Sequence, residues 1–219
     1  MRIDVAGRSH VGMKRNHNED AFLVLSDERL YSVADGMGGH AMGEIASRIA
    51  IEELAEFYKR TSRDADLTWP FKMDRTRNYE ENRLATGIKL ANARIYEAAS
   101  SDPNYRGMGT TIVTLHFADD GVYVGHVGDS RAYFLHGNTL EQISRDHNVV
   151  AHMQLRSANR GQRHNFIGRD RVQLLDPGED AVQLALQAVR LLRRNFHSGE
   201  VRDPLYRRLV DLGLCHGCL

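Results

Sequence analysis

Cysteine is scarce in this chain, and the only two, Cys215 and Cys218, lie at its very end. A small disulfide-stabilised domain would carry more cysteines, spread along the sequence. The pair has the spacing of a redox motif, but it does not follow a strand, and two cysteines alone do not complete a zinc site. Because chain ends are commonly disordered, we interpret this segment as a terminus without a chemical role.

Long hydrophobic runs and net charge are also lacking. No stretch approaches the roughly 20 apolar residues of a membrane-spanning helix, and Asp4 falls where a signal peptide would carry its apolar run. The 29 basic residues balance the 29 acidic ones, so no overall field attracts nucleic acid or an anionic membrane. These absences predict a cytoplasmic protein that binds neither nucleic acid nor membrane.

Lysine is absent after Val149, whereas arginine is abundant there. This shift predicts two parts, a main domain over residues 1–148 and a divergent, Arg-rich segment over residues 149–219. Apolar residues at helical spacing between 181 and 191 predict that the second part is partly helical. A replaced sequence and a frameshift both remain open as its origin. Interspersed acids and the lack of an aromatic platform argue against a tail that binds nucleic acid.

The residues that are present point first to a metal site at the end of a strand. Residues 30–34 are apolar and predict a strand that ends at Asp35. The following Gly36, Gly38 and Gly39 can adopt positive φ and leave room for a ligand beside the main chain. A carboxylate next to a backbone carbonyl supplies the oxygen ligands that Mg²⁺ or Mn²⁺ prefers. We therefore expect Asp35 and Gly36 to bind a divalent ion.

The same glycines also fit a dinucleotide-binding pattern, which places a glycine-rich turn between a strand and a helix. That fold needs a second parallel strand ending in an acid roughly 20 residues later. Residues 45–57 instead keep a helical rhythm. Asp35 would also repel a pyrophosphate, so we disfavour this alternative.

Just before the predicted strand lies a loop, Arg15-Asn-His-Asn-Glu-Asp20, whose groups suit phosphate and metal chemistry. The planar guanidinium of Arg15 matches two oxygens of a phosphate. Glu19 and Asp20 can orient waters around a metal ion. Charged loop residues are most often merely solvated, so a functional role for this loop depends on the other motifs that accompany it.

The hydrophobic pattern predicts an α+β protein. Amphipathic helices are expected over about 43–60 and 84–98. Turn signals between the later segments favour antiparallel hairpins, and helices that cover stacked sheets suit this mixture of elements. The predicted strands are 3–6, 22–25, 30–34, 111–117, 122–127, 133–135 and 140–143.

Five short motifs occur in order within residues 1–148, and together they resemble the bacterial branch of the protein phosphatase 2C family. The resemblance implies a four-layer α-β-β-α sandwich, incomplete at its C-terminus. The motifs are Arg15…Asn18-Glu19-Asp20, Asp35-Gly36-Met37-Gly38-Gly39-His40, Gly109-Thr110-Thr111, Gly128-Asp129-Ser130-Arg131 and Asp146-His147.

The resemblance also implies metal ligands by position. Asp35 would bridge two Mn²⁺ or Mg²⁺ ions, and Gly36 would offer its carbonyl to one of them. Asp129 matches an aspartate that helps to hold a third ion in bacterial members. Glu19 and Asp20 would position metal-bound waters.

The implied activity is that of a protein serine/threonine phosphatase that hydrolyses phosphomonoesters with a metal-activated water. Arg15 would hold the substrate phosphate and, with Asp35, form the catalytic residues. The expected partners are proteins phosphorylated on serine or threonine, and the enzyme would oppose a serine/threonine kinase.

Two later motifs of the family are absent from this sequence. Members normally complete the two-metal site with an aspartate in Ser-Asp-Gly-Leu and another in Gly-x-x-Asp-Asn, and neither string occurs after residue 148. We therefore retain a second interpretation, a non-catalytic, phosphatase-like regulator that binds phosphoproteins through Arg15.

Overall fold

The structure is a computed structural model that describes residues 3–13, 15–38, 42–64, 66–136, 139–147, 171–175 and 183–187. Gly39 and His40 of the predicted motif, both cysteines and most of the Arg-rich segment lie outside the described residues. Within the described residues no helix is both long and apolar enough to cross a bilayer.

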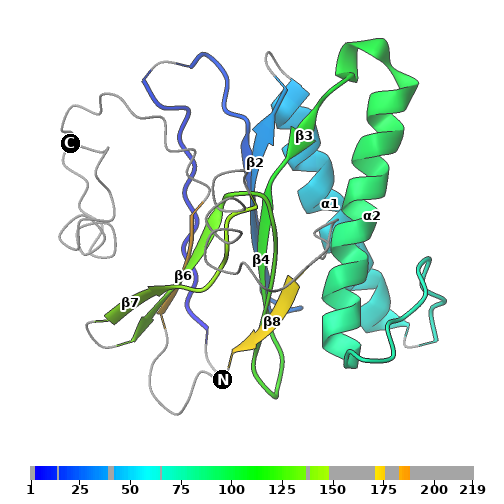
Figure 1. Cartoon of the computed structure of the whole chain (residues 1–219), viewed down its shortest axis with the longest axis vertical. Helices are drawn as coiled ribbons and strands as arrows, with labels where there is room; N and C mark the ends of the chain where they lie inside the picture. Colours follow the sequence, from blue (N-terminus) through cyan, green and yellow to red (C-terminus); the bar gives the residue numbers. More distant parts are fainter. Residues whose placement is uncertain are drawn as a thin grey trace, which may run out of the picture.

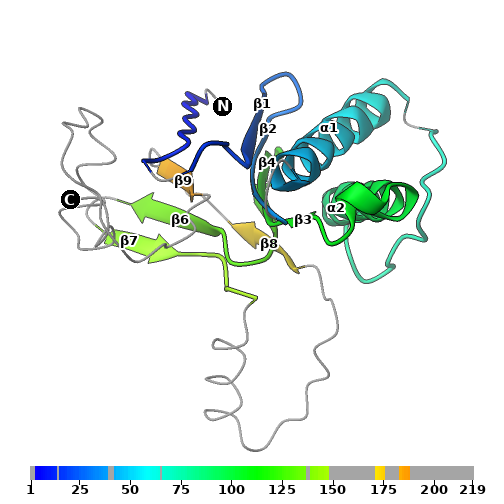
Figure 2. The same ribbon diagram turned by 90° about the horizontal axis from the view of Figure 1, so that it is seen from above.

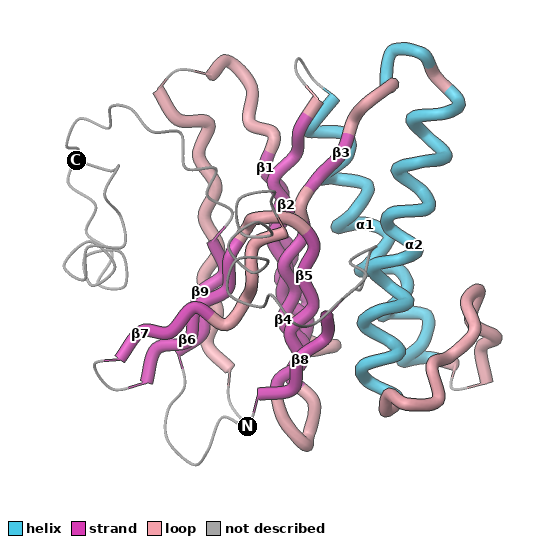
Figure 3. The backbone as a smooth tube through the Cα atoms, viewed as in Figure 1, coloured by secondary structure: helices cyan, strands magenta, loops and turns pink. Residues whose placement is uncertain are grey.

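Two antiparallel sheets form the centre of the molecule (Figure 1, Figure 3). The larger sheet has the strand order β1-β2-β4-β5-β8, and β3 pairs with the end of β2. Its strands are β1 (Asp20–Leu25), β2 (Leu30–Met37), β3 (Gly109–Thr110), β4 (Ile112–Phe117), β5 (Val122–Val127) and β8 (Arg171–Leu175). The smaller sheet, ordered β7-β6-β9, consists of β6 (Arg131–His136), β7 (Thr139–Gln142) and β9 (Gln183–Gln187).

Two long helices, α1 (Met42–Arg63) and α2 (Tyr79–Ser101), cover the face of the larger sheet that points away from the smaller one (Figure 2). A short 3-10 helix, Pro103–Tyr105, follows α2. The described residues thus form three layers, helices on sheet on sheet. The second helical layer of the predicted four-layer sandwich is not among them, but the α+β prediction is confirmed.

Two apolar clusters hold these layers together. Leu54 on α1 and Leu84 on α2, both fully buried, pack with Leu30 of β2 between the helices and the sheet. Between the two sheets, Val113 on β4 packs with Ala132 on β6. Because successive strand residues point to opposite faces, the larger sheet contributes to both clusters and is apolar on both sides.

The two predicted helices and most of the predicted strands are confirmed, and the start of α2 shows a local reason. Asn78 caps this helix by accepting a hydrogen bond from the Glu81 amide at 2.8 Å, and the Glu81 carboxylate accepts one from the Asn78 amide at 3.1 Å. Such a reciprocal capping box satisfies two amides that would otherwise lack partners.

Two predicted elements are wrong. Residues 3–6 form no strand, because β1 is the edge of its sheet in the described part of the chain, and strand propensity without a paired neighbour is weak. Residues 183–187 form strand β9 where helical spacing predicts a helix. Leu184 pairs with Phe134 and Leu186 with Ala132. These leucines are two residues apart, as in a strand, and pairing with β6 selects the strand over the helix that the wider spacing predicts.

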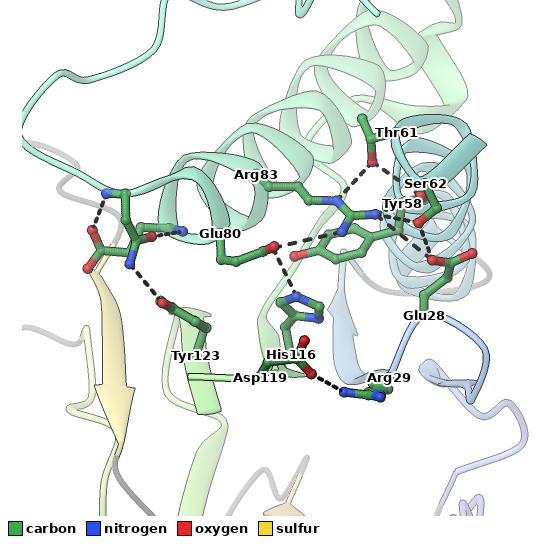
Figure 4. A network of polar contacts seen from close by, with 12 residues as sticks. Glu28, Arg29, Tyr58, Thr61, Ser62, Glu80, Arg83, His116, Asp119 and Tyr123 are labelled. Atoms are coloured by element: carbon green, nitrogen blue, oxygen red, sulfur yellow. Dashed lines mark hydrogen bonds and ion pairs between the residues drawn. The ribbon is translucent and has the colours of Figure 1, made fainter. Parts of the chain in front are cut away.

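A buried arginine joins both helices to the larger sheet (Figure 4). Arg83 on α2 donates to the Thr61 hydroxyl and to the Tyr58 carbonyl, each at 2.9 Å, and its guanidinium lies 4.3 Å from the centre of the Tyr58 ring. It also lies 3.8 Å from Glu80, whose carboxylate contacts His116 Nε2 on β4 at 3.0 Å. Since a buried charge is tolerated only when it is paired and hydrogen-bonded, this network fixes how the helices pack.

Replacing Arg83 by Met should lower the free energy of unfolding by about 3 kcal/mol, because one partner of a buried ionic network is removed and Glu80 is left uncompensated. Arg94→Met on the same helix is the matched control, since the Arg94 side chain is 55% exposed and pairs with Glu53 and Glu97 at the surface. Urea unfolding of both variants measures the difference. Equal losses would show that the network adds nothing to the packing.

Candidate functional site

Two carboxyl groups meet where β1 and β2 pair. The register places Asp20 directly opposite Asp35, and Asp35 is buried. Burial is the largest cause that raises the pKa of Asp20 to about 6, and the charge of Asp35 and a hydrogen bond with Asp35 raise it further. The positive charge of Arg15 acts in the opposite direction. A proton or a cation is therefore needed to relieve the repulsion between these two acids.

Arg15 lies beside this pair and is held by Glu19. Its Nη1 donates to Glu19 Oε2 at 3.0 Å, and about a third of its side chain is exposed. Glu19 is buried, and its own carbonyl accepts hydrogen bonds from the Gly36 amide at 3.0 Å and the Ser47 hydroxyl at 2.7 Å. Arg15 is thus attached to a residue that β2 and α1 hold from two sides.

Helix α1 approaches strand β2 closely beside the acid pair. A Cβ atom on Gly36 would lie 2.0 Å from the Gly43 carbonyl oxygen, and a Cβ on Gly43 would lie 2.9 Å from Glu19 Cδ. Side chains at either position would push the helix away from the strand. The sequence analysis missed Gly43, although a glycine in the first turn of a helix is a usable signal.

Asp129 lies on a neighbouring turn, between β5 and β6, and is exposed. The turn begins at Gly128, whose φ of 105° favours glycine. Next to Asp129, the buried Ser130 hydroxyl lies 2.6 Å from Thr111 Oγ1, and Thr111 Oγ1 accepts the Asp35 amide at 3.1 Å. The turn that carries Asp129 is therefore connected to the backbone of Asp35 through two hydroxyl groups.

The last predicted motif holds this turn in place. Arg131 donates to both carboxylate oxygens of Asp146, at 2.9 and 2.6 Å, and the His147 amide donates to the Gly128 carbonyl at 2.8 Å. Such a two-pronged pair is both strong and directional. The sequence analysis included these residues in the motifs without giving them a role, and the structure assigns them a structural one.

The oxygen donors of the site fit a hard cation in part. Within the described residues no group of three or more His, Cys, Asp or Glu side chains is arranged to hold a metal. The donors that lie together are the Asp20 and Asp35 carboxyl groups, and Gly36 follows Asp35 on β2. Mg²⁺ commonly binds through one or two carboxylates and keeps several waters, so this donor set fits one weakly held ion.

Comparison with known proteins identifies the family. The family described as "Protein phosphatase 2C" matches residues 6–186, which is most of the chain. The chain belongs to this family. Among curated members, the serine/threonine phosphatase stp of Listeria welshimeri is 38% identical over 146 residues, which are 65% of this chain and 54% of that protein. PstP of Mycobacterium tuberculosis is 35% identical over 145 residues, 66% of this chain and 25% of that protein.

Solved structures of phosphatase 2C relatives share the fold. The catalytic domain of PstP in complex with two manganese ions has a TM-score of 0.55 and 29% identity, covering 82% of this chain and 70% of that one. PppA of Pseudomonas aeruginosa has a TM-score of 0.59 and 32% identity, covering 82% and 73%. This chain spans about half the length of the first curated relative, 54%.

The raised pKa of Asp20 predicts how stability depends on pH in the metal-free protein. Because the folded state holds this proton more tightly than the unfolded state does, the contribution of Asp20 to stability should fall as pH rises from about 4 to about 6. Asp20→Asn should remove this fall and raise the free energy of unfolding at pH 7 by about 1 kcal/mol, a value reduced for solvent screening of a half-buried group.

Thermal unfolding between pH 4 and pH 8 measures both effects. Asp27→Asn, in the exposed turn after β1, is the control and should retain the pH profile of the unaltered protein. A profile of Asp20→Asn identical to that of the unaltered protein would show that the two acids do not repel each other.

Proposed function

We propose that this chain acts as a metal-dependent protein serine/threonine phosphatase, with Arg15 and Asp35 as its catalytic residues. The observation that carries the proposal is the convergence of the Asp20 and Asp35 carboxyl groups beside the Arg15–Glu19 ion pair. Family membership supports the same activity, and the names of the relatives describe phosphatases acting on serine and threonine.

In this proposal the acids form the cation-binding side of the site. Asp35 and the Gly36 carbonyl are ligands, Asp129 helps to hold a further ion, and Glu19 and Asp20 accept hydrogen bonds from waters around the ions. Bound Mn²⁺ or Mg²⁺ supplies charge neutralisation and a more acidic water. The two manganese ions of the PstP complex support this choice of metal.

Arg15 forms the phosphate-binding side. Its pairing with Glu19 fixes the guanidinium in position, and its exposed part is free to face solvent-borne substrate. A guanidinium binds two phosphate oxygens at once and stabilises the charge that these oxygens carry during transfer. The substrates are then phosphoserine and phosphothreonine proteins, and the activity opposes a serine/threonine kinase. The cytoplasmic location stays a prediction of the sequence.

Turnover of p-nitrophenyl phosphate across a Mn²⁺ titration tests the proposal. Asp35→Asn should lower kcat by about 100-fold or more, since the charge that attracts the cation is removed. Arg15→Ala should raise KM about tenfold or more, because a charge-assisted, two-pronged contact with phosphate is lost. Arg48→Ala, an exposed position on α1, is the matched control and should leave both constants unchanged.

The absence of turnover by the unaltered chain at millimolar Mn²⁺ would overturn the catalytic proposal. Binding of a phosphopeptide that depends on Arg15 would then favour the non-catalytic regulator. That second candidate rests on the incomplete ligand set of the described residues.

A further inference from the structure

The ladder between β2 and the β3–β4 segment is irregular at the site. Val33 pairs with Val113 and Gly36 pairs with Thr110, a register that places Asp35 opposite Thr111. The Thr111 amide donates to the Asp35 carbonyl at 2.9 Å, as in a regular antiparallel pair. The return bond, however, runs from the Asp35 amide to the Thr111 hydroxyl at 3.1 Å. A side chain thus replaces the backbone carbonyl as the acceptor.

The Thr111 carbonyl, which would accept the Asp35 amide in a regular ladder, has another donor: the Thr110 hydroxyl donates to it at 2.9 Å. Both backbone groups of Asp35 are therefore bound by Thr111, one through its amide and one through its side chain. Since the direction of a side chain follows from the orientation of its own backbone, the contacts with Thr111 set where the Asp35 carboxylate points.

The same hydroxyl also contacts the turn that carries Asp129. Thr111 Oγ1 lies 2.6 Å from the Ser130 hydroxyl, and both residues are buried. The turn packs tightly here, because a Cβ atom on Gly128 would lie 2.6 Å from Thr111 Cγ2. Only a glycine allows this approach, so Thr111 is in contact with both segments that carry proposed metal ligands.

We propose that Thr111 is a positioning residue that aligns Asp35 and, through Ser130, the Asp129 turn for binding of divalent metal. The proposal rests on the function proposed above, and it assigns a role to a residue that is not itself a proposed ligand of metal or phosphate. Its hydroxyl sets the separation of two ligand-bearing segments from different strands. Removing the hydroxyl, with the side-chain volume kept, leaves the Asp35 amide and the Ser130 hydroxyl without this partner in a buried place.

The chain offers a matched control on the same strand region. Thr114 on β4 is also buried and also pairs with a serine, since its hydroxyl lies 2.8 Å from that of Ser32. Ser32 lies on β2 three residues before Asp35, and its hydroxyl contacts are with Thr114 and with the Val113 carbonyl. Thr114→Val therefore removes a buried threonine hydroxyl that contacts a serine, as Thr111→Val does, but at a site away from the acid pair.

Two measurements test the proposal. Electron paramagnetic resonance measures Mn²⁺ binding by the full chain, and hydrogen exchange of the Asp35 amide is measured in the metal-free protein. Thr111→Val should weaken Mn²⁺ binding about tenfold or more and speed exchange at Asp35 by a similar factor. Thr111→Ser, which restores the hydroxyl, should stay within about threefold of the unaltered chain in both. Thr114→Val should lower stability and leave both readouts within about twofold.

Mn²⁺ binding and Asp35 exchange in Thr111→Val that match those in Thr114→Val would overturn the proposal. If Thr111→Val does not fold, Ser130→Ala decides in its place: Asp35 exchange should rise severalfold because the Thr111 hydroxyl loses its second contact, and unchanged exchange would refute the proposal. If the unaltered chain binds no Mn²⁺, the proposed function fails, whereas the exchange rates still decide whether Thr111 positions Asp35.

Discussion

The pairing of β1 with β2 places two acids, Asp20 and Asp35, opposite each other at one end of the larger sheet. Like charges in such a place oppose folding unless a proton or a cation compensates them. Burial and the charge of Asp35 together raise the pKa of Asp20 to about 6. Arg15 relieves part of the repulsion from outside the pair. Because the two acids repel each other when no cation is present, this arrangement is suited to bind one.

The surroundings of the acid pair keep its geometry. The first turn of α1 approaches β2 so closely that only glycine fits at positions 36 and 43, and Glu19 is bound by both elements. On the helix side, the Arg83 network joins α1, α2 and β4 away from the site. The helical layer therefore acts as a fixed support against which the strand ends are held.

Sequence reasoning succeeded where chemistry and local pattern coincide. The periodicity of α2 is strong over several turns, and an apolar run leads to Asp35, so the helix and the strand were both predictable. The roles of the site residues stay a proposal. Sequence reasoning failed where the pairing of strands decides the structure. Residues 183–187 carry both a helical and a two-residue pattern, and only the presence of β6 beside them selects the strand. Thr111 lay within a predicted motif, yet its role depends on Ser130 and Asp35, which come from two other segments.

The sequence by itself determined the family, the mixture of helices and strands, and the residue types of the site, because these depend on local spacing and on side-chain chemistry. Only the tertiary structure decided which acids lie opposite each other, which hydroxyl groups connect the Asp35 backbone to the Asp129 turn, and which glycines allow two backbones to touch. Those features depend on strand register and on the approach of segments far apart in the chain. A linear pattern of residues does not specify distances between segments, whereas folding fixes them.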